Sequence, residues 1–128
     1  MKLYLVPLIF FAFFYNQVNA DPTGRIFITN ERGDTVSVIN GDSLMVEATI
    51  DVGDRPRGIG ISPDGSELYI AVSEENKIKV MDPVSLKIMR EFNAGSDPET
   101  FAVHPNGNIY ISNEDDAKAS VFDPKTGE

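Results

Sequence analysis

Arg55 and Arg57, in the stretch "DRPRG", are the side chains of this sequence best suited to binding an anion. A guanidinium group presents N–H donors in a planar fork that matches the oxygens of a carboxylate or a phosphate. The corresponding stretch "SDPET" carries Asp97 and Glu99 in place of the two arginines. The arginines could therefore bind a ligand or partner, or they could pair with these carboxylates between neighbouring repeats. The sequence leaves both interpretations open.

A second group of polar residues lies in the stretch "SNEDD". Asn113 and Glu114 of this stretch, together with Asp97 and Glu99, are predicted to take part in ligand or partner binding. Carboxylate oxygens can also ligate a hard cation such as calcium. These carboxylates show no ordered ligand spacing, and runs of charged residues are usually solvated loops. We therefore predict no metal site.

The single histidine, His104, is the strongest candidate for acid–base chemistry, but it occupies a turn position that Ser62 holds in the preceding repeat. No Ser-His-Asp set, second histidine or phosphate-binding glycine loop accompanies it. We predict no catalytic residue and no cofactor.

These side chains lie within an internal repeat of the sequence. The stretch "GDRPRGIGISPDG" from Gly53 returns as "GSDPETFAVHPNG" from Gly95, 42 residues later. The repeated segments are short, rich in Val, Ile, Phe, Tyr and Thr, and bounded by Gly, Pro, Asn and Asp, as is typical of β-strands separated by turns. The segments expected to form strands are 25–30, 35–40, 45–53, 57–62, 67–72, 77–82, 87–95, 99–104, 108–113 and 118–123.

This pattern predicts an all-β fold, a β-propeller with four-stranded antiparallel blades, because four strands in about 42 residues is the measure of one blade. The segment "RGIGIS" suits the innermost strand, since Gly58 and Gly60 are small where strands crowd together. The loops that carry Arg55, Asp97 and Asn113 are expected at one end of the blades. The turns "SPDG" and "HPNG" are expected at the other end. The repeat count indicates an incomplete N-terminal fragment of about 2.5 blades, with units at 25–52, 53–94 and 95–128.

The segments "DTVSVIN", "DRPRGIGISPDGSELYIAV", "GSDPETFAVHPNGNIYISNEDD" and "SVFDPKTGE" resemble the YVTN-type β-propeller repeats. Within these repeats, "RPRG", "DPE" and "SNEDD" are most similar to the propeller proteins associated with pyrroloquinoline-quinone (PQQ)-dependent catabolism of alcohols. The resemblance covers essentially the whole chain from Arg25. It implies an exported seven-bladed propeller associated with periplasmic quinoprotein oxidation. "ELYIAV" departs from the pattern because it lacks the terminal Asn.

The first 20 residues differ from the rest and are predicted to be a signal peptide. Lys2 is followed by an apolar run from Leu3 to Tyr15, which is shorter than the roughly 20 residues needed to span a bilayer. The stretch "VNA" provides a cleavage site, so residues 21–128 are expected to form the partial propeller domain. The protein is therefore predicted to be periplasmic or secreted.

The overall charge bears on partners. With 20 acidic and 11 basic residues the chain carries a net charge of −9, which repels nucleic acid and anionic membranes. The leading hypothesis is a non-catalytic binding or scaffold protein, with a small molecule or a periplasmic quinoprotein dehydrogenase system as its partner. The alternatives are a propeller enzyme, either a lactonase or a cofactor-dependent reductase, with its catalytic residues in the missing part, and a cell-surface adhesive repeat protein.

Overall fold

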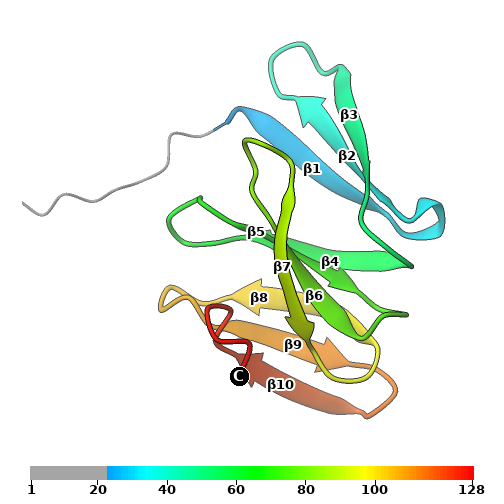
Figure 1. The fold of residues 1–128 in the computed structure, drawn as a ribbon, viewed down its shortest axis with the longest axis vertical. Coiled ribbons are helices and arrows are strands. Elements are labelled where there is room, and N and C mark those ends of the chain that lie inside the picture. The colour runs from blue at the N-terminus through cyan, green and yellow to red at the C-terminus, as the bar shows by residue number, and fades with distance from the viewer. Residues whose placement is uncertain (1–22) are drawn as a thin grey trace, which may run out of the picture.

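The computed structural model describes residues 23–128 (Figure 1), so the predicted signal peptide at residues 1–20 lies outside the described residues. Ten strands and one short 3-10 helix make up this part of the chain. They are β1 (Arg25–Asn30), η1 (Glu31–Gly33), β2 (Thr35–Asn40), β3 (Val46–Asp51), β4 (Pro56–Ile61), β5 (Leu68–Val72), β6 (Lys77–Met81), β7 (Ile88–Asn93), β8 (Pro98–Val103), β9 (Ile109–Asn113) and β10 (Lys118–Phe122).

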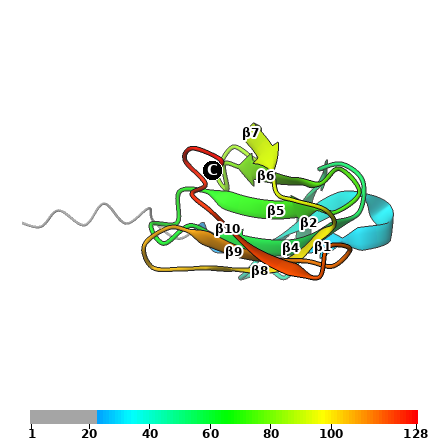
Figure 2. The same ribbon diagram turned by 90° about the horizontal axis from the view of Figure 1, so that it is seen from below.

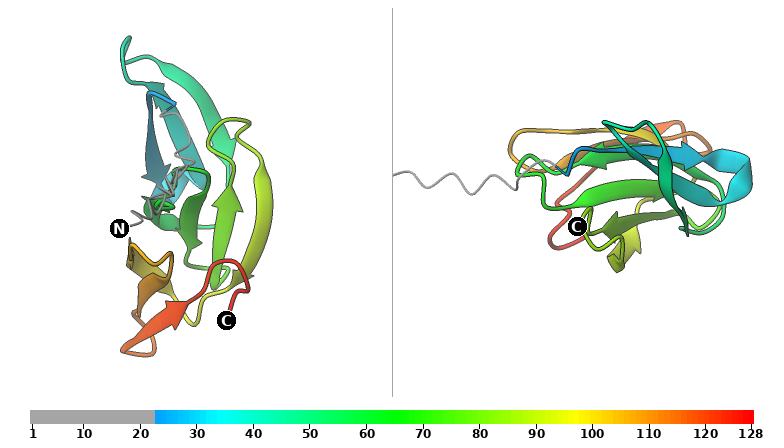
Figure 3. Two further views of the ribbon diagram at one scale, coloured as in Figure 1. Left: turned by 90° about the vertical axis from the view of Figure 1, so that its left-hand side faces the viewer. Right: turned by 90° about the horizontal axis from the view of Figure 1, so that it is seen from above.

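The strands form three antiparallel sheets, which confirms the all-β prediction. The first sheet has the order β1-β2-β3, the middle sheet β4-β5-β6-β7, and the third sheet β8-β9-β10. Each is a simple meander, with neighbours in sequence paired in space. Of the sheets in residues 23–128, only the middle one has all four strands of a blade. The sheets follow one another in a row from cyan to red (Figure 3), as successive blades of a propeller do.

The innermost strands of neighbouring sheets lie close together. Strand β4 contacts both β1 and β8, and these three strands lie along one side of the molecule while β7 lies on the opposite side (Figure 2). A Cβ added to Gly58 would lie 2.6 Å from the carbonyl oxygen of Glu99 on β8. A Cβ on Gly60 would lie 2.9 Å from the Phe101 ring. The crowding of the inner strands therefore leaves no room for a side chain at either position, as predicted.

The middle sheet packs against a neighbouring sheet on each of its faces, and all five residues of its strand β5 are buried. Leu68, Ile70 and Val72 pack toward the first sheet, in a core that includes Val36. The alternate residues of β5 pack toward the third sheet, in a core that includes Ile109 and Ile111 of β9. Because side chains alternate along a strand, one short apolar strand can join both interfaces.

The loops between the strands lie at two opposite ends of the sheets. Successive turns of a meander alternate between the two ends of the strands, so the loops after β1, β3, β5, β7 and β9 share one end. The tight turns after β4, β6 and β8 lie at the other end. Residues 23–128 include no helix with the length and apolar character needed to cross a membrane.

Candidate functional site

The loops that carry three of the six predicted site residues, Arg55, Asp97 and Glu114, meet on one end of the sheets, as expected. We call this end the loop face and define it by residues 31–34, 52–55, 73–76, 94–97 and 114–117. Backbone hydrogen bonds connect each loop to the next: Val52 N to Asp34 O at 3.0 Å, Ser73 N to Arg55 O at 3.1 Å, Ala94 N to Asn76 O at 2.9 Å and Glu114 N to Asp97 O at 3.1 Å. The loop face is therefore one continuous surface built from all three sheets.

Side chains at equivalent positions hold the entry to each inner strand. The backbone N–H of Arg55 donates to Oδ1 of Asp34 at 3.0 Å, and that of Asp97 donates to Oδ1 of Asn76 at 2.8 Å. All four residues have positive φ angles, 61° and 58° for the first pair and 43° and 59° for the second. Short polar side chains such as Asp and Asn tolerate this left-handed conformation because they form local hydrogen bonds. Equivalent hydrogen bonds thus fix the backbone at positions 55 and 97, and with it the point from which each side chain extends.

Arg55 lies between two carboxylates of the loop face. Its Nε donates to Glu31 Oε1 at 3.1 Å and its Nη1 donates to Glu74 Oε1 at 3.1 Å. These hydrogen bonds, that to Glu31 foremost, raise the pKa of Arg55 above its ordinary value. The Arg55 side chain is 37% exposed, whereas that of Glu74 is 60% exposed. Arg55 is therefore fixed in place by a partner that faces solvent and can be displaced.

Arg57 lies deeper, with 23% of its side chain exposed. It forms an ion pair with Glu99 of β8, and its Nη1 lies 3.7 Å from Glu114 Oε2. Its Nη2 lies 3.8 Å from Glu31 Oε1. The pairing of Arg57 with Glu99 between neighbouring sheets is one that the sequence suggested. The other suggested pair, between Arg55 and Asp97, does not form an ion pair among the described residues.

The predicted carboxylates do come together. Oxygen atoms of Asp97, Glu99 and Glu114 all lie within 4.8 Å of one another. Arg57 contacts two of these residues and supplies a positive charge to the group. The cluster is therefore organised around a guanidinium group.

Asn113 is placed differently from the other predicted site residues. It is 2% exposed, and its amide nitrogen donates to the carbonyl oxygens of Ala94 at 2.8 Å and Ser96 at 3.1 Å. Its Oδ1 accepts a hydrogen bond from the hydroxyl of Ser120 at 2.7 Å. The Asn113 side chain thus fastens the loop between β7 and β8 to β9. Its prediction as a binding residue remains untested, but its polar atoms are engaged within the fold.

One hollow in the loop face and a second beside it, along the inner strands, give room for a ligand. One, of about 340 Å³, lies beside Arg55 and is lined by Ser73, Glu74, Asn76, Ser96, Asp97 and Asp115 as well. The other, of about 310 Å³, lies beside Arg57 and includes Glu31, Glu99 and Thr29. Glu31 and Glu74 were not among the predicted site residues. Their only signal in the sequence is that they lie in loops on the same face as Arg55.

Comparison with known proteins supports the fold. No protein-family model matches the chain, and no curated protein matches it in sequence. Hydrazine synthase of Kuenenia stuttgartiensis has a similar solved structure, with a TM-score of 0.75 and 23% identity over 82% of this chain and 31% of that one. The dihydro-heme d1 dehydrogenase NirN gives a TM-score of 0.67 and 24% identity over 81% of this chain and 22% of that one.

The WD40 β-propeller domain of Doa1 is also similar, with a TM-score of 0.69 and 18% identity over 87% of this chain and 36% of that one. The chain thus spans between 22% and 36% of the length of these solved structures. Two of them bear the names of enzymes and the third is a WD40 domain, so one architecture serves different purposes. At these identities the likeness shows the fold alone: residues 23–128 have the architecture of a β-propeller.

Proposed function

We propose that this chain is part of an exported, non-catalytic β-propeller that binds a small molecule or a partner protein through its loop face. We further propose that it serves a periplasmic quinoprotein system of PQQ-dependent alcohol oxidation. Export is supported by the apolar N-terminal run and its small-residue cleavage site. The quinoprotein association is supported by the resemblance carried by "RPRG", "DPE" and "SNEDD".

One observation carries the binding proposal: Arg55 and Arg57 lie at the edges of two hollows and are held by carboxylates, Arg55 by Glu31 and Glu74 and Arg57 by Glu99. A binding group that is already ordered loses less conformational entropy when its ligand arrives. Glu31, Glu74 and Glu99, which could otherwise act as acids or bases, are engaged with these arginines. This arrangement favours recognition over catalysis.

The exposure of the partners indicates how an anion would bind. Glu74 and Glu114 are 60% and 66% exposed, whereas Glu99 is 23% exposed. A ligand carboxylate or phosphate would replace the exposed partners, while Glu99 keeps Arg57 in position. Each guanidinium group would then donate hydrogen bonds both to a carboxylate of the protein and to the ligand.

The test uses the intact protein and a purified PQQ-dependent alcohol dehydrogenase, with binding measured by biolayer interferometry. Replacing both Arg55 and Arg57 by Ala is expected to weaken binding by about 1–3 kcal/mol per lost charge-assisted contact. Arg32→Ala is the matched control, since Arg32 is an exposed arginine of the same face. If the double variant binds normally and only its melting temperature falls, the arginines are inter-blade ties and the binding proposal is wrong.

Export has its own test. Mass spectrometry of the mature protein should show Asp21 as the first residue. An exported protein that retains Met1 would contradict the proposed cleavage.

A further inference from the structure

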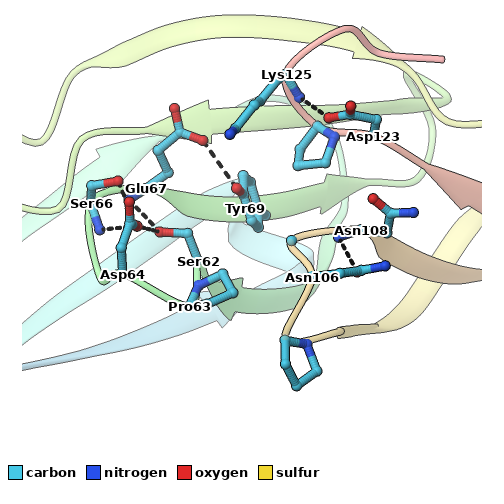
Figure 4. Close-up of a pocket in the computed structure, with 13 residues that line it drawn as sticks. Ser62, Pro63, Asp64, Ser66, Glu67, Tyr69, Asn106, Asn108, Asp123 and Lys125 are labelled. Carbon is cyan, nitrogen blue, oxygen red and sulfur yellow. Dashed lines mark hydrogen bonds between the residues drawn. The ribbon is translucent and has the colours of Figure 1, made fainter. Parts of the chain in front are cut away.

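A cavity of about 310 Å³ opens at the end of the strands opposite the loop face (Figure 4). It lies between the middle and third sheets, where the turns after β4, β8 and β10 meet. We call it the turn cavity and define it by six polar residues that line it: Asp64, Tyr69, Asn106, Asn108, Asp123 and Lys125. The sequence predicted the turns after β4 and β8 at this end of the blades and assigned them no site residue.

The wall of the turn cavity is fixed by a hydrogen-bonded network. Tyr69 is 2% exposed, and its hydroxyl donates to Glu67 Oε2 at 3.0 Å. Arg90 donates to both oxygens of Glu67 and to the carbonyl oxygen of Pro124, which belongs to the turn after β10. Burial, aided by the hydrogen bond to Glu67, raises the pKa of Tyr69, so its hydroxyl stays neutral. Arg90 therefore links the middle sheet to the turn after β10, and this link fixes the spacing between the two sides of the cavity.

The carboxylates at the rim retain unused acceptors. Oδ1 of Asp64 accepts hydrogen bonds from the Ser62 hydroxyl at 2.6 Å and from the Ser66 hydroxyl at 2.7 Å. Oδ1 of Asp123 accepts from the backbone N–H of Lys125 at 2.8 Å. Within residues 23–128, Oδ2 of each carboxylate forms no hydrogen bond. Both side chains are thus held in place by one oxygen while the other stays available.

Donors are available as well. Oδ1 of Asn106 accepts a hydrogen bond from the backbone N–H of Asn108 at 2.9 Å, which leaves the NH₂ group of Asn106 for other contacts. The Asn108 amide and the Lys125 ammonium group form no hydrogen bond with other side chains of the described part. Proline rings at positions 63, 105 and 124 add apolar surface between these polar groups.

We propose that the turn cavity binds a small, neutral, polyhydroxylated molecule of the size of a monosaccharide. Each hydroxyl group both donates and accepts, so such a ligand can satisfy the carboxylate oxygens and the amide and ammonium donors together. An anionic ligand would be repelled by Asp64 and Asp123, and a cationic ligand would be repelled by Lys125. The volume is at the lower end of the range for ligand pockets, about 300–1,000 Å³, which suits one sugar ring. This site is separate from the loop face and does not depend on the function proposed there.

Isothermal titration calorimetry with the intact protein tests the proposal, using glucose as the neutral probe. Glucuronate and glucosamine serve as anionic and cationic probes of the same size. Glucose should give saturable binding, and each charged probe should bind more weakly. Asn108→Ala and Lys125→Ala should each reduce glucose affinity by about threefold to tenfold, the loss expected for one hydrogen bond.

Asn93→Ala and Lys87→Ala are the matched controls, because both residues are exposed and neither lines the cavity. They should bind glucose as the unaltered protein does. Circular dichroism of each variant should match that of the unaltered protein, since none of the four side chains forms a hydrogen bond within the described residues. Absence of saturable glucose binding, tighter binding of either charged probe, or equal losses in the cavity and control variants would each overturn the proposal.

Discussion

Arg90 binds Glu67 with both of its terminal nitrogens, donating from Nη1 to Oε1 at 2.6 Å and from Nη2 to Oε2 at 2.8 Å. The same Nη2 donates to the carbonyl oxygen of Pro124 in the third unit at 3.1 Å. In the first sheet, Arg25 donates from Nη1 to the carbonyl oxygen of Pro83 at 3.1 Å. Each arginine thus ties one sheet to the proline turn that belongs to the next. Two different positions of the repeat perform the same task.

Replacing Arg90 by Ala should lower the free energy of unfolding by about 2 kcal/mol, because it leaves the partly buried Glu67 without its cation and frees the Pro124 turn. Urea denaturation followed by circular dichroism measures this loss. Lys87→Ala, at an exposed site nearby, should change stability by less than about 0.5 kcal/mol. Equal stability of the two variants would mean that the Arg90 contacts contribute nothing to the docking of the sheets.

Replacing Gly58 by Ala should destabilise the fold by about 1–3 kcal/mol, because the new methyl group would lie 2.6 Å from a backbone carbonyl oxygen of β8. The backbone cannot move aside without separating β4 from β8. Gly33→Ala is the control, since the nearest atoms to its Cβ would be 3.6 Å away. Thermal denaturation compares the two variants. A Gly58→Ala protein as stable as the control would show that the inner strands separate easily.

Acidification should remove a contribution of Asp64 to stability. Hydrogen bonds from Ser62 and then Ser66 lower the pKa of Asp64 from 3.8 to about 2. A lowered pKa in the folded state means that the stabilisation is complete above pH 4 and is lost as the pH falls through about 2. Between those values the stability of Asp64→Asn should therefore decline less steeply than that of the unaltered protein. Urea midpoints measured at pH 6, 4 and 2.5 would reveal the difference, and parallel pH profiles would contradict it.

Replacing Ala117 by Gly should stabilise the protein by about 1 kcal/mol. Ala117 has a φ angle of 50°, a conformation that costs an L-residue with a Cβ about 1–2 kcal/mol. Ala119→Gly, two residues later in β10, should have the opposite effect because glycine is unfavourable within a strand. Differential scanning calorimetry should give melting temperatures that move in opposite directions. A fall for both variants would show that the Ala117 conformation is not strained.

Much of the fold could be predicted from the sequence because its signals are local. Alternating apolar residues bounded by Gly and Pro determine strands and turns, and their return every 42 residues determines the blade. Comparing one repeat with the next also gives the need for a small residue at position 58, and it raises the pairing of Arg57 with Glu99 as one of two alternatives. These inferences need only the order of strands within a meander.

The features that depend on packing between sheets were not predictable in this way. Arg25 and Glu67 occupy equivalent positions of the repeat, whereas Arg90 occupies a different one. Alignment of the units therefore does not show that Arg25 and Arg90 both donate to a proline carbonyl oxygen. Pairing of Arg55 with Asp97 was one of two interpretations left open, but Arg55 meets Glu31 and Glu74, whose side chains come from other loops. The turn cavity lies between units, so no single repeat contains it.

The burial of β5 on both faces determines the order in which the structure should open. Amide protons become exchangeable with solvent when a segment unfolds locally, and the energy required rises with the apolar contacts that must be broken. Opening either flanking sheet breaks one interface, whereas releasing β5 breaks two. The amides of Leu68–Val72 should therefore exchange with deuterium more slowly than those of β3 or β10. The five residues of β5 are thus expected to be the last segment of residues 23–128 to unfold.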